Sequence, residues 1–144
     1  MGEHDSVPRR VVLDAGPIIA LLHKKDRDHE SAKTGFQQLA DAGSRLTTPL
    51  PVVLEVYKWL LDEAGPASAQ EGLRRMRESL EVAFPGPEDF DAAATLTDSI
   101  PNWAGTLEDA VVVLTALRMR VPVWTLNYRD LGAFPTLRFW TPDR

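Results

Sequence analysis

The 144-residue sequence contains no cysteine, which excludes disulfide bonds, thiolate zinc sites and cysteine nucleophiles. It also lacks any apolar run near the roughly 20 residues of a membrane-spanning helix, and its polar first ten residues do not form a signal peptide, so we expect no membrane association. Positive charge is scarce, because 16 Lys and Arg stand against 21 Asp and Glu. The composition therefore disfavours a broad basic surface for nucleic acid and leaves room for a local basic patch.

What the sequence does contain is typical of a globular protein, with 44% hydrophobic and 26% charged residues. A chain of this size can bury roughly two-thirds of the surface that its unfolded form exposes, which is enough for a core without structural metal. We expect one domain over residues 1–144, in which residues 1–9 form a flexible tail. The absence of cysteine is compatible with a reducing compartment, and we expect the cytoplasm.

Short apolar runs alternate with helical patterns along the chain. This alternation predicts a three-layer α/β/α sandwich with a mostly parallel central sheet, in which functional sites form at the carboxyl ends of the strands. We expect strands at 10–14, 45–47, 80–83, 121–125 and 138–140, and helices at 18–22, 28–42, 51–63, 67–79, 88–99 and 107–119.

Four polar residues lie in apolar surroundings and are candidates for chemistry: Asp14, Glu55, Asp109 and Asn127. An isolated buried carboxylate is costly, so several that converged on one place would favour a hard divalent metal ion. Asn127 lies just past the apolar run at 121–125, while Asp14 closes the one at 10–14; taken alone, Asn127 is a typical turn residue.

Each acid also has a purely structural interpretation. Asp14 can cap the helix that follows it, and Glu55 lies on the polar side of its helix with Lys58 within reach for an ion pair. Thr106 and Asp109 have the spacing of a capping box, with Asp in place of the usual Glu or Gln. The individual residues therefore leave structure and function open.

The order and spacing of several short segments carry more information than any one of them. An apolar strand ends in Asp-Ala, a D-x-x-H-x-x-A stretch follows, a helical Glu comes after Thr-Pro-Leu, an Asp-Ala pair opens an apolar helix, and a Thr-x-Asn element follows a late strand. Between about Val11 and Phe139 this pattern resembles the PIN-domain nucleases, in particular the VapC-like toxins of prokaryotic toxin–antitoxin pairs. The residues concerned are Val12–Ala15, Asp26, His29, Ala32, Glu55, Asp109, Ala110 and Thr125–Asn127.

The resemblance implies a PIN-like fold and a metal-dependent ribonuclease. In that family, acidic residues gather at the strand ends and hold Mg²⁺ or Mn²⁺, which assigns Asp14, Glu55 and Asp109 as metal ligands. The implied reaction is hydrolysis of an RNA phosphodiester by an activated water, with 5′-phosphate and 3′-hydroxyl products.

At one position the chain departs from the family. Where the family usually has Thr-x-Asp, this sequence has Thr125-Leu126-Asn127, so a neutral amide replaces a carboxylate. Because the amide supplies no charge, we expect one metal ion rather than two, with Asn127 still among the catalytic residues and the Thr125 hydroxyl near the site. Asp130 and Glu108 are nearby acids that could compensate, although each alone reads as a solvated surface residue.

RNA contacts are expected from a few basic and aromatic residues. Arg129 is the better basic candidate because it lies beside Asn127, and Arg74 and Arg75 form a second cluster that neighbouring glutamates dilute. Trp103 precedes the Asp109 helix and could stack a base, although burial in the core is the ordinary role of tryptophan.

The resemblance also implies partners: an RNA substrate, a cognate antitoxin that blocks the acidic cleft, and a second copy of the chain in a homodimer. An alternative function is that of an impaired PIN-like module that binds RNA or protein without turnover. Asn127 is the reason for this alternative, because it replaces a usual acidic residue. A phosphate-accepting receiver domain shares the α/β outline, but it needs a lysine after a late strand. All four lysines, at positions 24, 25, 33 and 58, lie in the first half of the chain.

Overall fold

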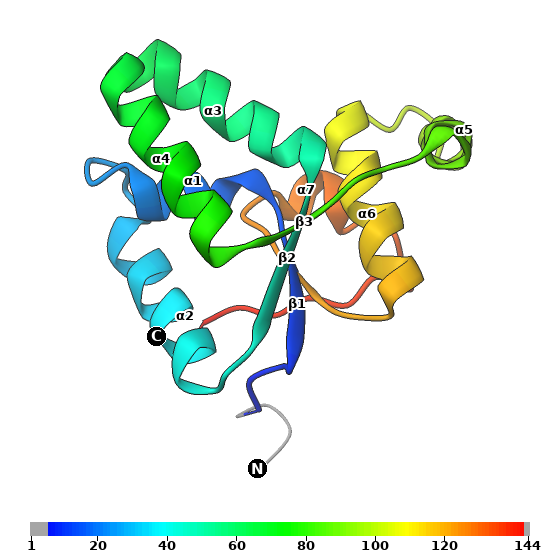
Figure 1. Cartoon of the computed structure of the whole chain (residues 1–144). Helices are drawn as coiled ribbons and strands as arrows, with labels where there is room; N and C mark the ends of the chain where they lie inside the picture. Colours follow the sequence, from blue (N-terminus) through cyan, green and yellow to red (C-terminus); the bar gives the residue numbers. More distant parts are fainter. Residues whose placement is uncertain (1–5, 143–144) are drawn as a thin grey trace.

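A computed structural model describes residues 6–142 of the chain, and its centre is a four-stranded sheet in the order β3-β2-β1-β4 (Figure 1). The strands are β1 (Arg10–Leu13), β2 (Arg45–Pro49), β3 (Glu81–Ala83) and β4 (Val123–Trp124). All three neighbouring pairs are parallel, which confirms the predicted parallel sheet.

Helices connect the strands and cover both faces of the sheet. α2 and α4 lie on one side of the strands and α6 lies on the other (Figure 1), so the expected three-layer arrangement is present. The helices are α1 (Ala15–Leu22), α2 (His29–Asp41), α3 (Leu50–Ala64), α4 (Pro66–Ser79), α5 (Pro87–Asp98), α6 (Leu107–Met119) and α7 (Tyr128–Leu131).

The core lies between the sheet and the two helical layers. Val11, Val12 and Leu13 of β1 are 0% exposed, as a strand covered on both faces requires. On α6, Val112 and Val113 are also 0% exposed and belong to the same cluster as β1. The apolar strand and the apolar helix that flank two candidate acids are therefore rigidly packed, which fixes the backbone from which those acids project.

Three details differ from the sequence-based expectations. The strand expected at 121–125 shrinks to Val123–Trp124, because Pro122 has no N–H and Thr125 turns toward Asp14. The strand expected at 138–140 is wrong, since only one isolated bridge joins Phe139 to Val123. The short helix α7 was not expected at all, because four residues are too few to show helical periodicity.

Part of the predicted N-terminal tail, residues 1–5, lies outside the described residues. Its remainder contacts the body of the protein, since the Ser44 hydroxyl donates to the Pro8 carbonyl at 2.6 Å and the Arg45 N–H donates to the Arg9 carbonyl at 2.8 Å. In the part of the chain that the structure describes, no helix is both long and apolar enough to cross a lipid bilayer.

Candidate functional site

The candidate site forms where the order in which strands are added to the sheet reverses. The order β3-β2-β1-β4 means that successive strands are added on one side of β1 until β4 returns to its other side. In parallel α/β sheets such a switch point leaves a crevice at the carboxyl ends of the two strands. Asp14 directly follows β1 and Thr125 directly follows β4, so both lie at this crevice.

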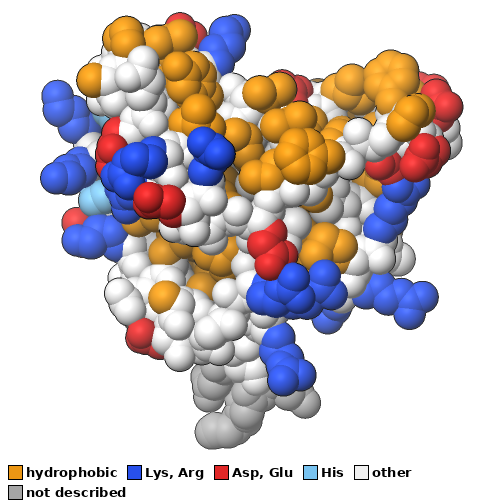
Figure 2. Space-filling view, viewed as in Figure 1, with side chains coloured by type: hydrophobic (Ala, Val, Ile, Leu, Met, Phe, Trp, Pro, Cys, Tyr) orange, Lys and Arg blue, Asp and Glu red, His pale blue; other side chains and the backbone are white. Residues whose placement is uncertain are grey.

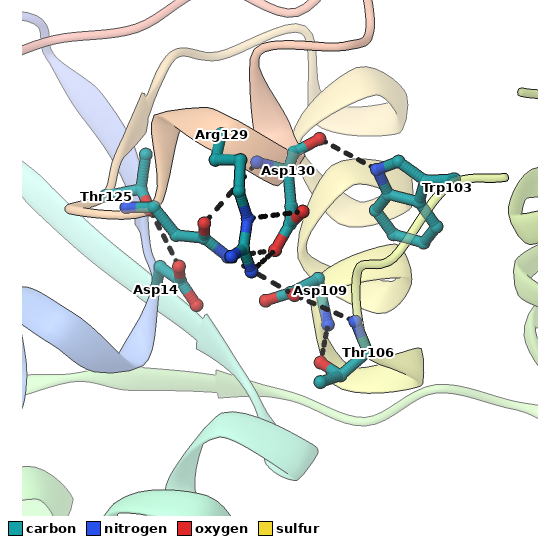
Figure 3. Close-up of polar contacts among 8 residues, drawn as sticks. Asp14, Trp103, Thr106, Asp109, Thr125, Arg129 and Asp130 are labelled. Carbon is teal, nitrogen blue, oxygen red and sulfur yellow. Dashed lines mark hydrogen bonds and ion pairs between the residues drawn. The ribbon is translucent and has the colours of Figure 1, made fainter.

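Asp14 is held at that edge by two hydrogen bonds. Its Oδ1 accepts the Ala15 backbone N–H at 2.8 Å, which caps α1, and its Oδ2 accepts the Thr125 hydroxyl at 2.7 Å (Figure 3). The side chain is buried, and this burial raises its pKa despite both bonds, with a further contribution from the charge of Asp109. The capping role predicted for Asp14 is confirmed, and it leaves the carboxylate facing the other acids.

Asp109 comes from the first turn of α6. Its backbone N–H donates to the Thr106 hydroxyl at 3.1 Å, and its Oδ2 accepts the Thr106 N–H at 2.9 Å, so the predicted capping box is confirmed. Its residue is only 8% exposed. The helix start thus holds one carboxylate oxygen and points the group toward the crevice.

The structure adds Asp130 of α7 to these two acids. Asp130 is only 5% exposed, whereas the sequence alone favoured a solvated surface residue. The Asn127 amide nitrogen donates to Oδ2 of Asp130 at 3.1 Å and to Oδ2 of Asp109 at 3.4 Å. The residue that breaks the family pattern therefore bridges two carboxylates, and a carboxylate three residues later lies at the same place.

Arg129 lies beside this bridge. Its guanidinium donates from Nε to Oδ1 of Asp130 at 3.1 Å and from Nη2 to Oδ2 at 2.8 Å, which lowers the pKa of Asp130. Hydrogen bonding from Asn127 lowers that pKa further. The Arg129 side chain is 81% exposed, so a cationic group at the rim of the crevice remains open to solvent.

Glu55 is an exposed residue of α3 that lines the groove between α3, α5 and α6, near enough to Asp14 and Asp109 to respond to their charges. Its pKa is raised to about 7; burial is the largest cause, and the negative charges of Asp14, Glu108 and Asp109 contribute the rest. Among the ion pairs of residues 6–142, none joins Glu55 to Lys58, whereas the other structural alternative, a solvated helix face, agrees with the exposure of Glu55. We call Asp14, Glu55, Asp109 and Asp130 the acidic cluster.

The chemistry of the acidic cluster fits a hard divalent cation. Asp14, Asp109 and Asp130 are on buried residues; the charge of Asp109 helps to raise the pKa of Asp14, and the charges of both Asp14 and Asp109 help to raise that of Glu55. Oxygen donors of this kind are the ligands that Mg²⁺ and Mn²⁺ prefer. Within residues 6–142, however, no three acidic or histidine side chains already stand at the spacing of a closed metal site. The carboxylate oxygens are suitable ligands for Mg²⁺ or Mn²⁺, and a metal titration tests whether they come together around one ion.

The remaining predicted site residues fall into two groups. Glu108 is half-buried beside the acidic cluster, where its charge contributes to the raised pKa of Glu55. Arg74 lies on α4, across the sheet from α6, and pairs with Glu71 and Glu78. The structure therefore brings Glu108 to the cluster and leaves Arg74 on a solvated helix face.

The D-x-x-H-x-x-A stretch serves packing between α1 and α2. His29 Nδ1 lies 2.7 Å from the Ala20 carbonyl oxygen, and Oδ1 of Asp26 accepts the Asp28 N–H at 2.8 Å. Ala32 is 3% exposed in the core. These contacts tie the second helix to the first and hold the loop that joins them.

The structure also has two grooves, and the first adjoins the site. The first, of about 510 Å³, adjoins the acidic cluster between α3, α5 and α6, and we call it the apolar groove. Glu55 and Glu108 lie at its edge, while Leu54, Phe90 and Leu107 in its wall are 60%, 63% and 45% exposed. In Figure 2 the hydrophobic side chains gather on this face of the molecule.

The second groove lies between α1, α2 and α4, and we call it the basic-rimmed groove. It consists of two adjoining hollows of about 220 and 410 Å³ that share Leu21, Phe36 and Arg75. Its floor is apolar, and Lys24, Lys33 and Arg75 line its charged end. No Asp or Glu among residues 6–142 lines either hollow.

The sequence around Asp130 contains a signal for a helix start. Asn127 and Asp130 have the same spacing as Thr106 and Asp109, a polar N-cap residue followed three residues later by an acid. In the structure the Asn127 side chain indeed caps α7, accepting the Asp130 N–H at 3.4 Å. The repeated pattern predicts a second helix start, and with it a second buried carboxylate.

Comparison with known proteins gives information on the fold. No model of a protein family matches the chain, and no curated protein sequence matches it. Solved structures do match: VapC20 from Mycobacterium tuberculosis, described as a toxin that cleaves the sarcin–ricin loop, superposes with a TM-score of 0.74 at 16% identity over 89% of this chain and 98% of its own.

Two toxin–antitoxin structures match over similar lengths. The DNA-bound VapBC complex from Salmonella typhimurium gives a TM-score of 0.72 at 14% identity, over 91% of this chain and 96% of its own. VapBC2 from Rickettsia felis, bound to a fragment of promoter DNA, gives 0.70 at 15% identity, over 93% and 99%. The chain therefore has the PIN-like α/β fold of the VapC toxins, as the sequence predicted.

Proposed function

We propose that this protein is a metal-dependent endoribonuclease of the VapC toxin kind. The proposal rests on the acidic cluster: Asp14, Asp109 and Asp130 are buried near the switch point of the sheet, and the pKa of Glu55 responds to the charges of Asp14 and Asp109. The shared fold with VapC toxins supports it. The proposed reaction is hydrolysis of RNA phosphodiester bonds, in the cytoplasm.

In the proposed site, Asp14, Glu55 and Asp109 hold Mg²⁺ or Mn²⁺, and Asp130 supplies the fourth carboxylate that Asn127 cannot. When bound, such an ion stabilises negative charge on a phosphodiester oxygen and lowers the pKa of a coordinated water. The Thr125 hydroxyl fixes the orientation of Asp14. With Asp130 as the fourth carboxylate, the amide at position 127 no longer implies a weakened metal site.

Asn127 and Arg129 act beside the metal ligands. The amide of Asn127 holds Asp109 and Asp130 close to one another by donating to both. Arg129 is exposed at the rim and offers a positive charge to the phosphate backbone of RNA. In the absence of RNA it pairs with Asp130 and reduces the repulsion within the acidic cluster.

We further propose that an antitoxin protein binds the basic-rimmed groove. Two of the structural neighbours are toxin–antitoxin complexes. An amphipathic helix that carries acidic residues matches an apolar floor with Lys24, Lys33 and Arg75 at one end. The double substitution of Lys24 and Lys33 by Glu should weaken binding of such a partner and leave RNA cleavage intact.

We propose homodimerisation through the apolar groove. Exposed apolar surface of this kind is uncommon on monomeric proteins unless it serves an interface. A dimer formed there brings two acidic clusters to the edges of one shared surface. Replacing Phe90 with Glu should shift the protein to a monomer in sedimentation equilibrium, whereas an unchanged mass would contradict this interface.

The direct test of the proposed function is cleavage of a mixed RNA pool by purified protein in Mg²⁺, Mn²⁺ or EDTA. Asp14→Asn, purified identically, controls for contaminating nucleases, and Asp62→Asn on the exposed side of α3 is the matched substitution outside the site. We expect cleavage that requires metal, disappears in Asp14→Asn and persists in Asp62→Asn. Absence of cleavage in every metal, with folded protein free of antitoxin, would favour the alternative of a module that binds without turnover.

A further inference from the structure

We propose that Trp103 is a positioning residue for the acidic cluster, acting through the backbone of α7 rather than on RNA. The indole Nε1–H donates to the backbone carbonyl oxygen of Asp130 at 2.8 Å (Figure 3). Trp103 lies in the loop between α5 and α6, three residues before Thr106, which caps the helix of Asp109. The inference rests on the proposed function, because it assigns Asp130 to the metal site.

The indole joins the two helix starts that carry Asp109 and Asp130. On one side it packs with Ala110 and Val111 of α6, and on the other its ring meets Phe134 edge-on, with centroids 5.3 Å apart. Because the ring is only partly exposed and its N–H is used, its contacts are with protein on both sides. The indole thus contributes, together with the Asn127 amide, to the position of the α7 carboxylate relative to the α6 carboxylate.

The loop is shaped to receive the indole. A Cβ on Gly105 would lie 2.2 Å from the Trp103 ring, so only glycine lets the ring cross the backbone there. Asn102 has a φ of 60°, a left-handed conformation that Asn tolerates, and the Trp103 N–H closes the turn on the Ile100 carbonyl at 3.2 Å. These features orient the indole toward Asp130 before any ligand binds.

A positioning role and a base-stacking role predict different measurements. Loss of the indole N–H leaves the Asp130 carbonyl without this donor and loosens α7, so metal affinity falls while the RNA surface is unchanged. Loss of a stacking platform instead weakens RNA binding and leaves metal affinity as it was. Metal affinity of the RNA-free protein therefore separates the two.

The experiment compares Trp103→Phe, which keeps an aromatic ring against Phe134 and removes only the N–H donor, with Trp59→Phe as the matched control. The Trp59 ring meets the His23 ring edge-on at the C-terminal end of α1, with centroids 5.1 Å apart. Mn²⁺ is titrated into the metal-free protein by calorimetry, and kcat and KM are measured on RNA. For Trp103→Phe we expect an Mn²⁺ dissociation constant raised about threefold to tenfold, a lowered kcat and an unchanged KM; Trp59→Phe should match the parent protein.

Urea unfolding in EDTA identifies a variant that fails to fold. In that case Gly105→Ala serves as the second variant, because its added Cβ displaces the ring while the indole remains. An Mn²⁺ affinity that stays at the parent value in a folded variant overturns the proposal, whether or not KM rises. If the parent protein neither binds Mn²⁺ nor cleaves RNA, the proposed function fails first; if it does both and Trp103→Phe changes neither, only the positioning role fails.

Discussion

Two of the helices that begin at the acidic cluster, α6 and α7, start with a polar cap followed three residues later by an aspartate. In α6 the carboxylate of Asp109 accepts the backbone N–H of Thr106, so the helix start itself holds it. In α7 the carboxylate of Asp130 lies against the side chains of Arg129 and Asn127. The same local pattern is thus present at both helix starts, but a backbone N–H holds the Asp109 carboxylate and side chains hold the Asp130 carboxylate. We infer that the position of Asp130 is the more sensitive to substitution of its neighbours.

The largest expected effect comes from removing either aspartate. Asp109→Asn and Asp130→Asn should each lower kcat on RNA by about 100-fold or more, because each takes a charge from the proposed metal site. Glu108→Gln, a matched neutralisation at the edge of the cluster, should change kcat much less. Near-parent activity in Asp130→Asn would show that the two helix starts are not equivalent and that Asp130 only pairs with the Arg129 and Asn127 side chains.

A smaller effect is expected for Arg129, which distinguishes the α7 start from the α6 start. Arg129→Ala should weaken RNA binding roughly fivefold and reduce the dependence of log K on log salt by about one. Arg77→Ala, on the exposed face of α4, is the control and should leave both unchanged. A weakened Mn²⁺ affinity with unchanged RNA binding would mean that Arg129 orients Asp130 instead of contacting phosphate.

Asn127→Asp sharpens the comparison in another way, since it restores the acid that the family usually has. It replaces an amide that donates to Asp109 and Asp130 with a further negative charge. We expect the metal-free protein to lose about 1–2 kcal/mol of unfolding free energy at pH 8, and Mn²⁺ to restore most of it. A large gain in cleavage with no loss of metal-free stability would instead identify the amide as a defect.

The smallest expected effect is a pH dependence from Glu55. Between its ordinary pKa of 4.5 and about 7, the folded state binds a proton that the unfolded state does not, so metal-free stability falls as pH rises through this window. Because Glu55 is partly exposed, we expect only about 1 kcal/mol, or roughly 3 °C in Tm, between pH 5 and pH 8. Thermal unfolding in EDTA measures this slope, and Glu55→Gln should reduce it; an equal slope in both proteins would assign it to other groups.

Much of the architecture could be predicted because residues close together in the sequence determine where its helices and strands begin. The apolar run before Asp14, the proline at the start of α3 and the capping box at Thr106 each fix an element from nearby residues alone. The predictions failed where tertiary contacts decide. The segment around Phe139 lies beside β4 and forms a single bridge, and α7 is too short for its periodicity to show.

The site was predicted in part for the same reason. Asp14 and Asp109 stand at helix starts, and the resemblance to PIN domains singled them out together with Glu55. Asp130 was predicted to be a solvated surface residue. Its burial depends on Asn127, Arg129 and the distant Trp103, whose contacts with it form only in the folded chain. The expected role of Trp103 as a base platform stays a prediction, and the structure offers the competing one.

The central claim is that Asp14, Asp109 and Asp130 share one cation with Glu55. Electron paramagnetic resonance of Mn²⁺ mixed with metal-free protein counts the bound ions directly, without RNA or partner. The account predicts saturable binding of Mn²⁺ by the parent protein and by Asp62→Asn, and an affinity at least about tenfold lower in Asp14→Asn, Asp109→Asn and Asp130→Asn alike. Binding that survives in all three variants, or that is absent from the folded parent protein, would contradict it.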